Sequence, residues 1–251
     1  MSKKAIGIDI GGTGIKGAVV NLKDGSLIGE RVRHETPSGG KPGDIAGVVA
    51  RLISELPDAK PDMLVGICFP AIVRNGITMS AANVSKEWIG LDADALFTKE
   101  LKRPVHVVND ADAAGIAEIK YGAGQDVEGL VIMTTLGTGI GSALFMNGKL
   151  IPNAELGHLE ILGVDYETKA SFAAKEREDL NWADWAERLQ NYYSTIERLF
   201  TPDLIIVGGG VSKQHEEFLP LLKLSTTIVP AQKRNNAGIL GAAASAKKAS
   251  R

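Results

Sequence analysis

The same four residues, GTGI, occur twice in this chain, at 12–15 and again at 137–140, a separation close to half of its 251 residues. Short apolar segments flank both copies: AIGID and AVV lie around the first, and LVIMT and ALF around the second. An apolar segment, a glycine-rich turn and a second apolar segment are typical of a β-hairpin. The repeat near the midpoint indicates an internal duplication, so we expect two halves that open with the same hairpin.

Outside the hairpins, apolar strand candidates alternate with helical patterns. Strands are expected at 64–69, 104–108 and 203–207, and helices at 44–55, 92–101, 111–121, 181–199 and 238–248. Alternation of strands and helices favours parallel pairing, whereas hairpins add antiparallel pairs, so each half should hold a mixed sheet in an α/β fold. No Pro/Ser-rich linker separates the halves. We therefore predict a small N-terminal α/β domain over 1–109 and a larger one over 110–251, with the last helix, about 238–251, packing back on the first.

Composition gives no sign of a nucleic-acid or membrane partner. The 28 basic and 30 acidic residues leave a net charge of −2, which attracts neither kind of polyanionic surface. No apolar run reaches the roughly 18–20 residues of a membrane span, and no signal-peptide pattern precedes the first strand. Cys68, the single cysteine, lies in the apolar run MLVGICFP and is interpreted as a core residue. A cytoplasmic location is the expectation.

The glycine loops match neither of the two common phosphate-binding motifs. Lys16 is followed by Gly17 and an apolar run, so the Walker pattern fails, and GTGIGS opens a strand where the dinucleotide fingerprint opens a helix. The remaining possibility is an anion held at the tip of a hairpin, where glycines let backbone N–H groups converge. Either loop alone could be an ordinary tight turn. Two facing loops would grip one phosphate chain from both sides.

The predicted donor site contains both loops and one acidic residue. Asp9 lies at the rim of the first loop, where it could hold Mg²⁺ directly or through water. The donor-binding residues are predicted to be Asp9, Gly11, Gly12, Thr13, Gly14 and Lys16 in the first hairpin, and Thr135, Gly137, Thr138 and Gly139 in the second.

The segments DIGGTGIK and LGTGIG, with NDADAAG between them, resemble the ROK kinases ("repressor, ORF, kinase") of the actin–hexokinase–Hsp70 superfamily. Within that family, SAANVSKEWIG, PNAELGHLE and LFTPDLIIVGGGVSK are similar to segments of bacterial polyphosphate glucokinases. The resemblance runs almost end to end. It implies two lobes of actin/hexokinase-like (ribonuclease H-like) mixed sheets with an interdomain cleft, and a homodimer. It also implies phosphorylation of the 6-hydroxyl of glucose by inorganic polyphosphate and by ATP, with Mg²⁺.

The same resemblance assigns the sugar side. Asp110 would be the general base that accepts the proton of the attacking hydroxyl. Asn83, Asn109, Glu155 and His158 would contact the hexose, through hydrogen bonds to neighbouring hydroxyls. Read without the family, Asn109 or Asp110 could simply be the N-cap of the helix expected at 111–121.

Two further segments are matched with changes. The family's other sugar glutamate lies in a cysteine-rich zinc segment, but LEILGVDYETKAS contains no cysteine, so no zinc site is expected and Glu167 is the best match for that glutamate. Gly208, Gly209 and Gly210 in IIVGGGVSK match the adenosine-side loop, where a purine would lie flat against the backbone. The alternative is a strand-to-helix turn with Ser212 as its cap.

Other functions fit part of this pattern. ROK repressors and sugar sensors bind a hexose without turnover, but they carry an N-terminal helix-turn-helix for which the residues before the first strand leave no room. A polymerising actin-like ATPase would share the hairpins without needing ELGHLE or NDADAAG. An ATP-only kinase for glucose, mannose or another hexose also fits, because a polyphosphate donor needs a basic track. The candidates for such a track are Lys16, Lys86, Lys102, Arg103, Lys233 and Arg234.

Overall fold

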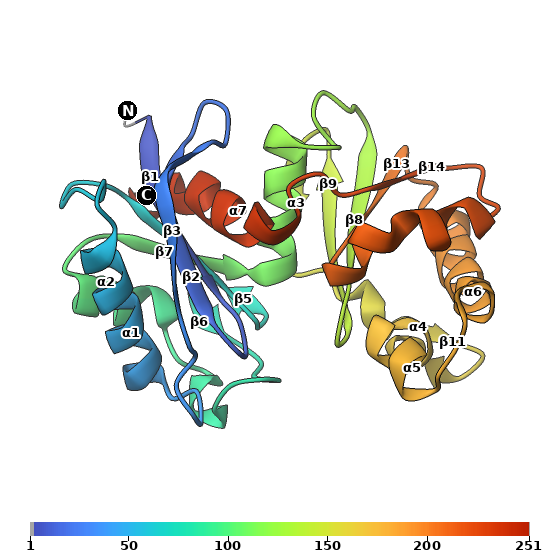
Figure 1. Ribbon diagram of the computed structural model, residues 1–251, viewed down its shortest axis with the longest axis horizontal. Coiled ribbons are helices and arrows are strands. Elements are labelled where there is room, and N and C mark those ends of the chain that lie inside the picture. The colour runs from blue at the N-terminus through green and yellow to red at the C-terminus, as the bar shows by residue number, and fades with distance from the viewer. Residues whose placement is uncertain (1–2, 251) are drawn as a thin grey trace. The chain divides into compact units, whose positions relative to one another are not determined.

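The computed structural model describes residues 3–250, which form two compact units (Figure 1). Unit 1 comprises Met1–Ala117 and Asn236–Arg251, and unit 2 comprises Glu118–Asn235. The first boundary falls inside helix α3 (Asp110–Tyr121). The start of α3 groups with unit 1 because it packs on the C-terminal helix α7, where a Cβ on Gly241 would lie 1.7 Å from the carbonyl oxygen of Ala113.

Unit 1 is built on a five-stranded mixed sheet with the strand order β3-β2-β1-β4-β7. The first three strands form an antiparallel meander, and β4 and β7 run parallel to β1. Their bounds are β1 Lys4–Ile10, β2 Ile15–Asn21, β3 Leu27–His34, β4 Val65–Phe69 and β7 Val105–Asn109. A small hairpin of β5 (Val73–Arg74) and β6 (Ile77–Thr78) follows β4.

Helices cover both faces of this sheet (Figure 1). Helices α1 (Pro42–Glu55) and α2 (Ala93–Leu101) bury their apolar faces on one side, with the 3₁₀ turn η1 (Lys86–Trp88) nearby. Trp88 packs between Phe69 and Phe97, so it is a core residue. Helix α7 (Ala237–Ser245), followed by η6 (Ala246–Ser250), lies on the other face.

Two strand glycines allow α7 to approach the sheet closely. A Cβ on Gly7 would lie 2.0 Å from the carbonyl oxygen of Ile239, and a Cβ on Gly66 would lie 1.8 Å from that of Ala242. Any larger residue at either position would push the helix away from β1 and β4. Cys68 is fully buried under this helix, as expected for a core thiol.

Unit 2 repeats the plan, with the strand order β10-β9-β8-β13-β14. An antiparallel meander of three strands again precedes two strands that run parallel to the first of them. The bounds are β8 Leu130–Leu136, β9 Ile140–Met146, β10 Lys149–Ile151, β13 Leu204–Gly208 and β14 Thr227–Pro230. The predicted duplication and the predicted mixed sheet in each half are therefore confirmed.

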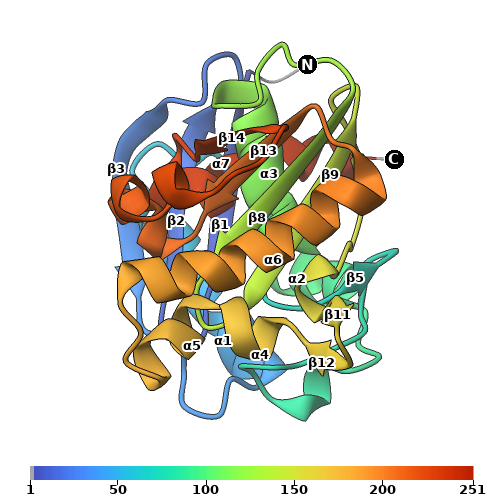
Figure 2. The same ribbon diagram turned by 90° about the vertical axis from the view of Figure 1, so that its right-hand side faces the viewer.

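The long helix α6 (Trp182–Phe200) runs across the sheet of unit 2, with α4 (Glu167–Ala170), α5 (Phe172–Arg177) and the hairpin β11–β12 along one side of it (Figure 2). The side chain of Asn181 caps its N-terminus, and its apolar stripe buries Trp185, Leu189, Tyr192 and Ile196. The remaining elements are η2 (Leu156–His158), β11 (Glu160–Ile161), β12 (Val164–Asp165), η3 (Gly210–Glu217), η4 (Leu219–Leu221) and η5 (Arg234–Asn236).

The strands expected at 64–69, 104–108 and 203–207 are confirmed, as are the five expected helices, with ends that differ by at most three residues. No helix within residues 3–250 combines the length and apolar character needed to cross a lipid bilayer.

Candidate active site

The tip of the first hairpin is the four-residue loop 11–14, which joins Ile10 of β1 to Ile15 of β2. The N–H of Gly11 donates to the carbonyl oxygen of Gly14 over 3.0 Å and closes the loop. A Cβ on Gly12 would lie 3.3 Å from the Cβ of Asn83. The structure thus brings the predicted sugar ligand Asn83 beside the predicted phosphate loop.

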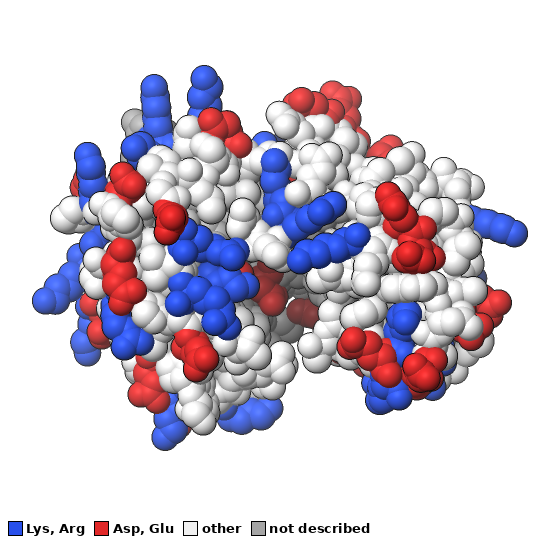
Figure 3. All heavy atoms as spheres, viewed as in Figure 1, with Lys and Arg blue, Asp and Glu red and all other residues white. Residues whose placement is uncertain are grey.

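Cationic side chains border this loop. Asp9, Lys16 and Arg33 are register partners across β1, β2 and β3, and the Lys16 ammonium lies 3.8 Å from the Asp9 carboxylate. The Arg33 guanidinium donates to the carbonyl oxygen of Thr13 over 3.3 Å and would lie 2.9 Å from a Cβ on Gly14. Figure 3 shows Lys and Arg side chains gathered on the face of unit 1 over strands β2 and β3. Sequence reasoning missed Arg33, because only the register of β3 places it next to the loop.

Asp9 has a second partner on the opposite side of its carboxylate. The Cys68 thiol donates to Asp9 Oδ1 over 3.3 Å, and burial followed by the negative charge of Asp9 raises the pKa of this thiol well above its ordinary value. Cys68 is therefore a protonated donor and not a nucleophile. Within the described part of the chain, no three His, Cys, Asp or Glu side chains cluster as a metal site.

The carboxyl ends of three neighbouring parallel strands meet on this side of unit 1. Asp9 lies near the end of β1, Cys68 near the end of β4, and Asn109 and Asp110 follow one another at the end of β7. The charge of Asp110 also contributes to the raised pKa of Cys68, which is consistent with this grouping. Ligand sites in open α/β sheets lie at such carboxyl ends.

The Asn109 side chain has a structural role at the start of α3. Its Oδ1 accepts the N–H of Asp112 over 3.0 Å, which is N-cap geometry, and its Nδ2 donates to the carbonyl oxygen of Ala71 over 3.0 Å. The alternative of an N-cap is therefore confirmed for Asn109. Asp110, the next residue, is exposed at the first turn of α3, and its Oδ1 accepts the N–H of Ala111 over 2.8 Å.

The tip of the second hairpin is one residue shorter, with 137–139 between Leu136 and Ile140. The N–H of Gly137 donates to the carbonyl oxygen of Gly139 over 2.9 Å. Glu167 lies directly against this tip. Its Oε2 accepts the N–H of Ile140 over 2.6 Å and would lie 2.4 Å from a Cβ on Gly139.

Three of the predicted sugar residues are neighbours in unit 2. Partial burial raises the pKa of the Glu155 carboxyl, and the charge of Glu167 adds to the rise while that of His158 opposes it. His158 Nδ1 lies 2.8 Å from Asp165 Oδ2. This hydrogen bond is the main cause of a raised His158 pKa, and the charges of Glu167, Asp165 and Glu155 act in the same direction against partial burial.

Asp165 is the second residue that sequence reasoning missed. It lies in the segment LEILGVDYETKAS, whose two-residue strands carry too little periodicity to predict, so its approach to His158 could not be read from the sequence.

The glycines at 208–210 form a sharp connection between β13 and η3. Gly209 has φ 85°, and a Cβ there would lie 2.1 Å from the carbonyl oxygen of Leu136, next to the tip of the second hairpin. Ser212 donates to the carbonyl oxygen of Gly209 with both its N–H and its hydroxyl. The alternative of a strand-to-helix turn is present, but Ser212 is not its cap, because Gly209 occupies the N-cap position and Ser212 lies inside η3. Contact of the three glycines with a purine stays a prediction.

Two candidates for a basic track are engaged locally. Arg103 donates to the carbonyl oxygens of Leu101 and Lys60, and the Lys86 ammonium donates to that of Ala81. Lys16 and Arg33, by contrast, lie beside the first glycine loop.

Comparison with known proteins gives consistent matches. Residues 5–170 match the model of the ROK family. A polyphosphate glucokinase of Mycobacterium tuberculosis is 43% identical over 242 residues, which cover 96% of this chain and 90% of the relative. The crystal structure of inorganic polyphosphate/ATP-glucomannokinase from Arthrobacter sp. strain KM has a TM-score of 0.91 and 55% identity, and 99% of each chain is covered.

A more distant solved structure shares the fold. The ROK family glucokinase from Streptomyces griseus, in complex with glucose and AMPPNP, has a TM-score of 0.78 at 24% identity and covers 98% of this chain and 99% of its own. The duplicated mixed sheets are those of the actin–hexokinase fold that these kinases share. With its glycine hairpins, its acidic strand ends and these full-length likenesses, the chain belongs to the ROK family.

Proposed function

We propose that this chain transfers a phosphoryl group to the 6-hydroxyl of glucose, with inorganic polyphosphate as donor and ATP as a second donor. The observation that carries the proposal is the 55% identity over 99% of both chains to an enzyme named for both donors. The mycobacterial relatives, named polyphosphate glucokinase, support the same acceptor and the polymeric donor. ATP-only phosphorylation of glucose, mannose or another hexose, and a non-catalytic sugar sensor, are the alternatives that this proposal opposes.

In this proposal Asp110 is the general base. A carboxylate at the exposed first turn of α3 can accept the proton of the sugar hydroxyl as that oxygen attacks phosphorus. Asn83, Glu155, His158 and Glu167 hold the hexose, with Asn109 adding whatever hydrogen-bonding capacity its cap and its bond to Ala71 leave. Asn109 has one amide hydrogen and a second carbonyl lone pair beyond these two bonds.

The first hairpin binds the donor phosphates in this proposal. The glycines at 12 and 14 carry no side chains of their own, so backbone N–H groups of the loop can face a phosphate, and Lys16 and Arg33 add positive charge beside it. Thr135, Gly137, Thr138 and Gly139 of the second hairpin complete the predicted phosphate contacts.

Asp9 fits a magnesium ion that arrives with the donor. Mg²⁺ in kinases is held by one or two carboxylates together with substrate phosphates and water, and Asp9 is a single carboxylate at the rim of a phosphate loop. When bound there, Mg²⁺ neutralises charge on the donor phosphates. Lys16 and Cys68 both contact the Asp9 carboxylate, so they hold this side chain in place whether or not the metal is present.

The assembly and the location belong to the same proposal. Family likeness supports a homodimer, which light scattering after gel filtration would measure directly. It also supports a cytoplasmic enzyme, because glucose kinases act on sugar that has entered the cell.

The direct test is formation of glucose 6-phosphate by purified protein with Mg²⁺, with nucleotide-free polyphosphate or ATP as the only donor. We expect activity with both donors, and the glucomannokinase name makes mannose the second acceptor to try. An Asp110→Asn preparation from the same host serves as the control for contaminating kinases. Activity with ATP alone would remove polyphosphate from the proposal, and no product with either donor would overturn it.

A further inference from the structure

We propose that Asp165 is a positioning residue of the sugar site, whose two carboxylate oxygens fix His158 and Glu167 relative to each other. Asp165 Oδ2 lies 2.8 Å from His158 Nδ1, and Asp165 Oδ1 accepts the backbone N–H of Glu167 over 3.2 Å. One side chain therefore contacts both residues. The consequence for sugar binding rests on the proposed function, whereas the geometry does not.

The local fold gives Asp165 its place. It ends β12 and pairs with Glu160 of β11, and the two strands are joined by Leu162 and Gly163, with φ angles of 55° and 75°. Two consecutive residues with positive φ form the tightest common hairpin turn, which leaves the register of β11 and β12 little freedom. The hairpin thus brings Asp165 back to His158, seven residues earlier in the chain.

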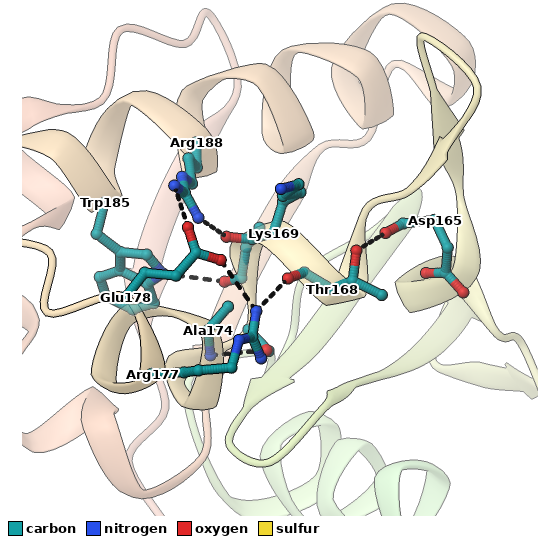
Figure 4. Close-up of polar contacts among 10 residues, drawn as sticks. Asp165, Thr168, Lys169, Ala174, Arg177, Glu178, Trp185 and Arg188 are labelled. Carbon is teal, nitrogen blue, oxygen red and sulfur yellow. Dashed lines mark hydrogen bonds and ion pairs between the residues drawn. The ribbon is translucent and has the colours of Figure 1, made fainter.

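The next helix is braced from the other side (Figure 4). Helix α4 has only four residues, too few to be stable alone. Its carbonyl oxygens accept hydrogen bonds from Arg177, Arg188 and Trp185, and Glu178 bridges the two arginines at 3.0 and 2.6 Å. The Asp165 carboxylate points away from this network, toward His158. The accepting carbonyls belong to Thr168, Lys169 and Ala170.

The bond to Asp165 determines what His158 can offer a ligand. An ionised carboxylate only accepts, so the proton of the neutral ring stays on Nδ1. Nε2 is then an acceptor in the neutral ring and a donor in the charged ring, and a sugar hydroxyl can pair with either. The ionisable groups that act on His158 are Asp165, Glu167 and Glu155, all acidic, and together they favour the charged ring.

The first test measures the tautomer and the pKa of the His158 imidazole ring. Nitrogen-15 NMR of the imidazole groups would follow the four histidines through a pH titration, with His158→Gln identifying the His158 signals. We expect the neutral wild-type ring to carry its proton on Nδ1. In Asp165→Asn, whose amide can donate or accept, we expect the pKa of His158 to decrease and the preference for Nδ1 to be lost.

Kinetics of the same variant provide the functional readout. Asp165→Asn should raise the KM for glucose about tenfold and change kcat less, because it disturbs sugar contacts and leaves Asp110 in place. Glu55→Gln is the matched control: Glu55 lies 2.8 Å from His34 Nε2 in unit 1, so that variant removes a carboxylate from another histidine and should leave the KM for glucose unchanged. Asp165→Ala, which removes both bonds, should raise the KM at least as much.

Two results would overturn the inference. The first is an Asp165→Asn protein in which the pKa and the tautomer of His158 match wild type. The second is a KM for glucose that stays at the wild-type value in a folded variant. If wild type forms no glucose 6-phosphate, the proposed function fails, and the NMR titration still decides whether Asp165 fixes the ring.

Discussion

The two glycine hairpins share the letters GTGI, yet they differ in the charge that lies against each tip. The first tip meets the guanidinium of Arg33, which comes from β3. The second meets the carboxylate of Glu167, which comes from α4 and accepts the N–H of Ile140. The same turn sequence therefore has a positive neighbour in unit 1 and a negative neighbour in unit 2, each supplied by a later segment of the chain.

We infer from this difference that the two hairpin tips have different tasks. A phosphate chain is attracted by Arg33 and Lys16 and repelled by Glu167, whereas a carboxylate suits the hydroxyls of a sugar. We infer that donor affinity depends mainly on the first tip and sugar affinity on the carboxylate at the second. The predicted donor contacts of 135–139 would then be made by backbone atoms, because the Glu167 carboxylate lies against the same tip.

The largest effect is expected from the residue that belongs to neither tip. Asp110→Asn should lower kcat by about 10³, since the amide cannot accept the proton of the attacking hydroxyl, while glucose binding measured by calorimetry persists. Glu167→Gln is the informative comparison, and it should retain more turnover. If Asp110→Asn kept turnover within tenfold of wild type while Glu167→Gln abolished it, the general base would be Glu167. The assignment of Glu167 to sugar binding alone would then be wrong.

A methyl group added to each tip sharpens the comparison. In Gly139→Ala the new methyl would lie 2.4 Å from Glu167 Oε2, which is held by the N–H of Ile140, so the carboxylate must move and the KM for glucose should rise about tenfold. In Gly14→Ala the methyl would lie 2.9 Å from the Arg33 guanidinium, an exposed group that can swing aside. We expect only about a twofold rise in the KM for donor, and steady-state kinetics with each substrate varied in turn would distinguish the two.

The smallest effect concerns Glu178, which pairs with the two arginines that donate hydrogen bonds to α4. The Arg188 guanidinium, and then that of Arg177, holds the pKa of Glu178 at about 2, below its ordinary 4.5. A lowered folded-state pKa contributes stability above about pH 4.5 that is lost as the pH falls toward 2. Glu178→Gln should therefore reduce the free energy of unfolding slightly at pH 7, and its difference from wild type should shrink on acidification.

Urea denaturation followed by tryptophan fluorescence would measure this effect, because Trp182 and Trp185 lie in α6 beside the brace. Glu176→Gln on α5 is the matched control, because neither ion pair of Glu178 involves Glu176. The difference in unfolding free energy between Glu178→Gln and wild type could instead stay constant from pH 7 to pH 2. That result would show that the ion pairs of Glu178 do not stabilise α4, the helix that begins at Glu167.

Periodicity and turn chemistry predicted the framework. The repeat of GTGI predicted two halves that open with the same hairpin and each hold a mixed sheet, and the helices over 44–55 and 181–199 followed from their amphipathic patterns. The turn chemistry and the amphipathic patterns depend only on residues a few positions apart, and the repeat needed only a comparison of two short segments. The mixed pairing followed in turn from hairpins placed beside strand–helix alternation.

The sequence did not predict which charged side chains lie next to the site residues. Arg33 reaches the first loop through the register of β3, and Asp165 reaches His158 through a hairpin of two-residue strands. Asn109 shows another limit, since one side chain can be both the cap of α3 and a predicted ligand. The choice between readings depends on which hydrogen bonds are already satisfied, and only the structure shows these.

The most direct test is a crossed kinetic comparison of Arg33→Gln and Glu167→Gln, with the KM for polyphosphate and the KM for glucose measured in both variants. The comparison of the tips predicts that Arg33→Gln raises the KM for polyphosphate about tenfold and leaves that for glucose near wild type, while Glu167→Gln does the reverse. A rise in the KM for polyphosphate in Glu167→Gln as large as that in Arg33→Gln would contradict the division of tasks between the two hairpins.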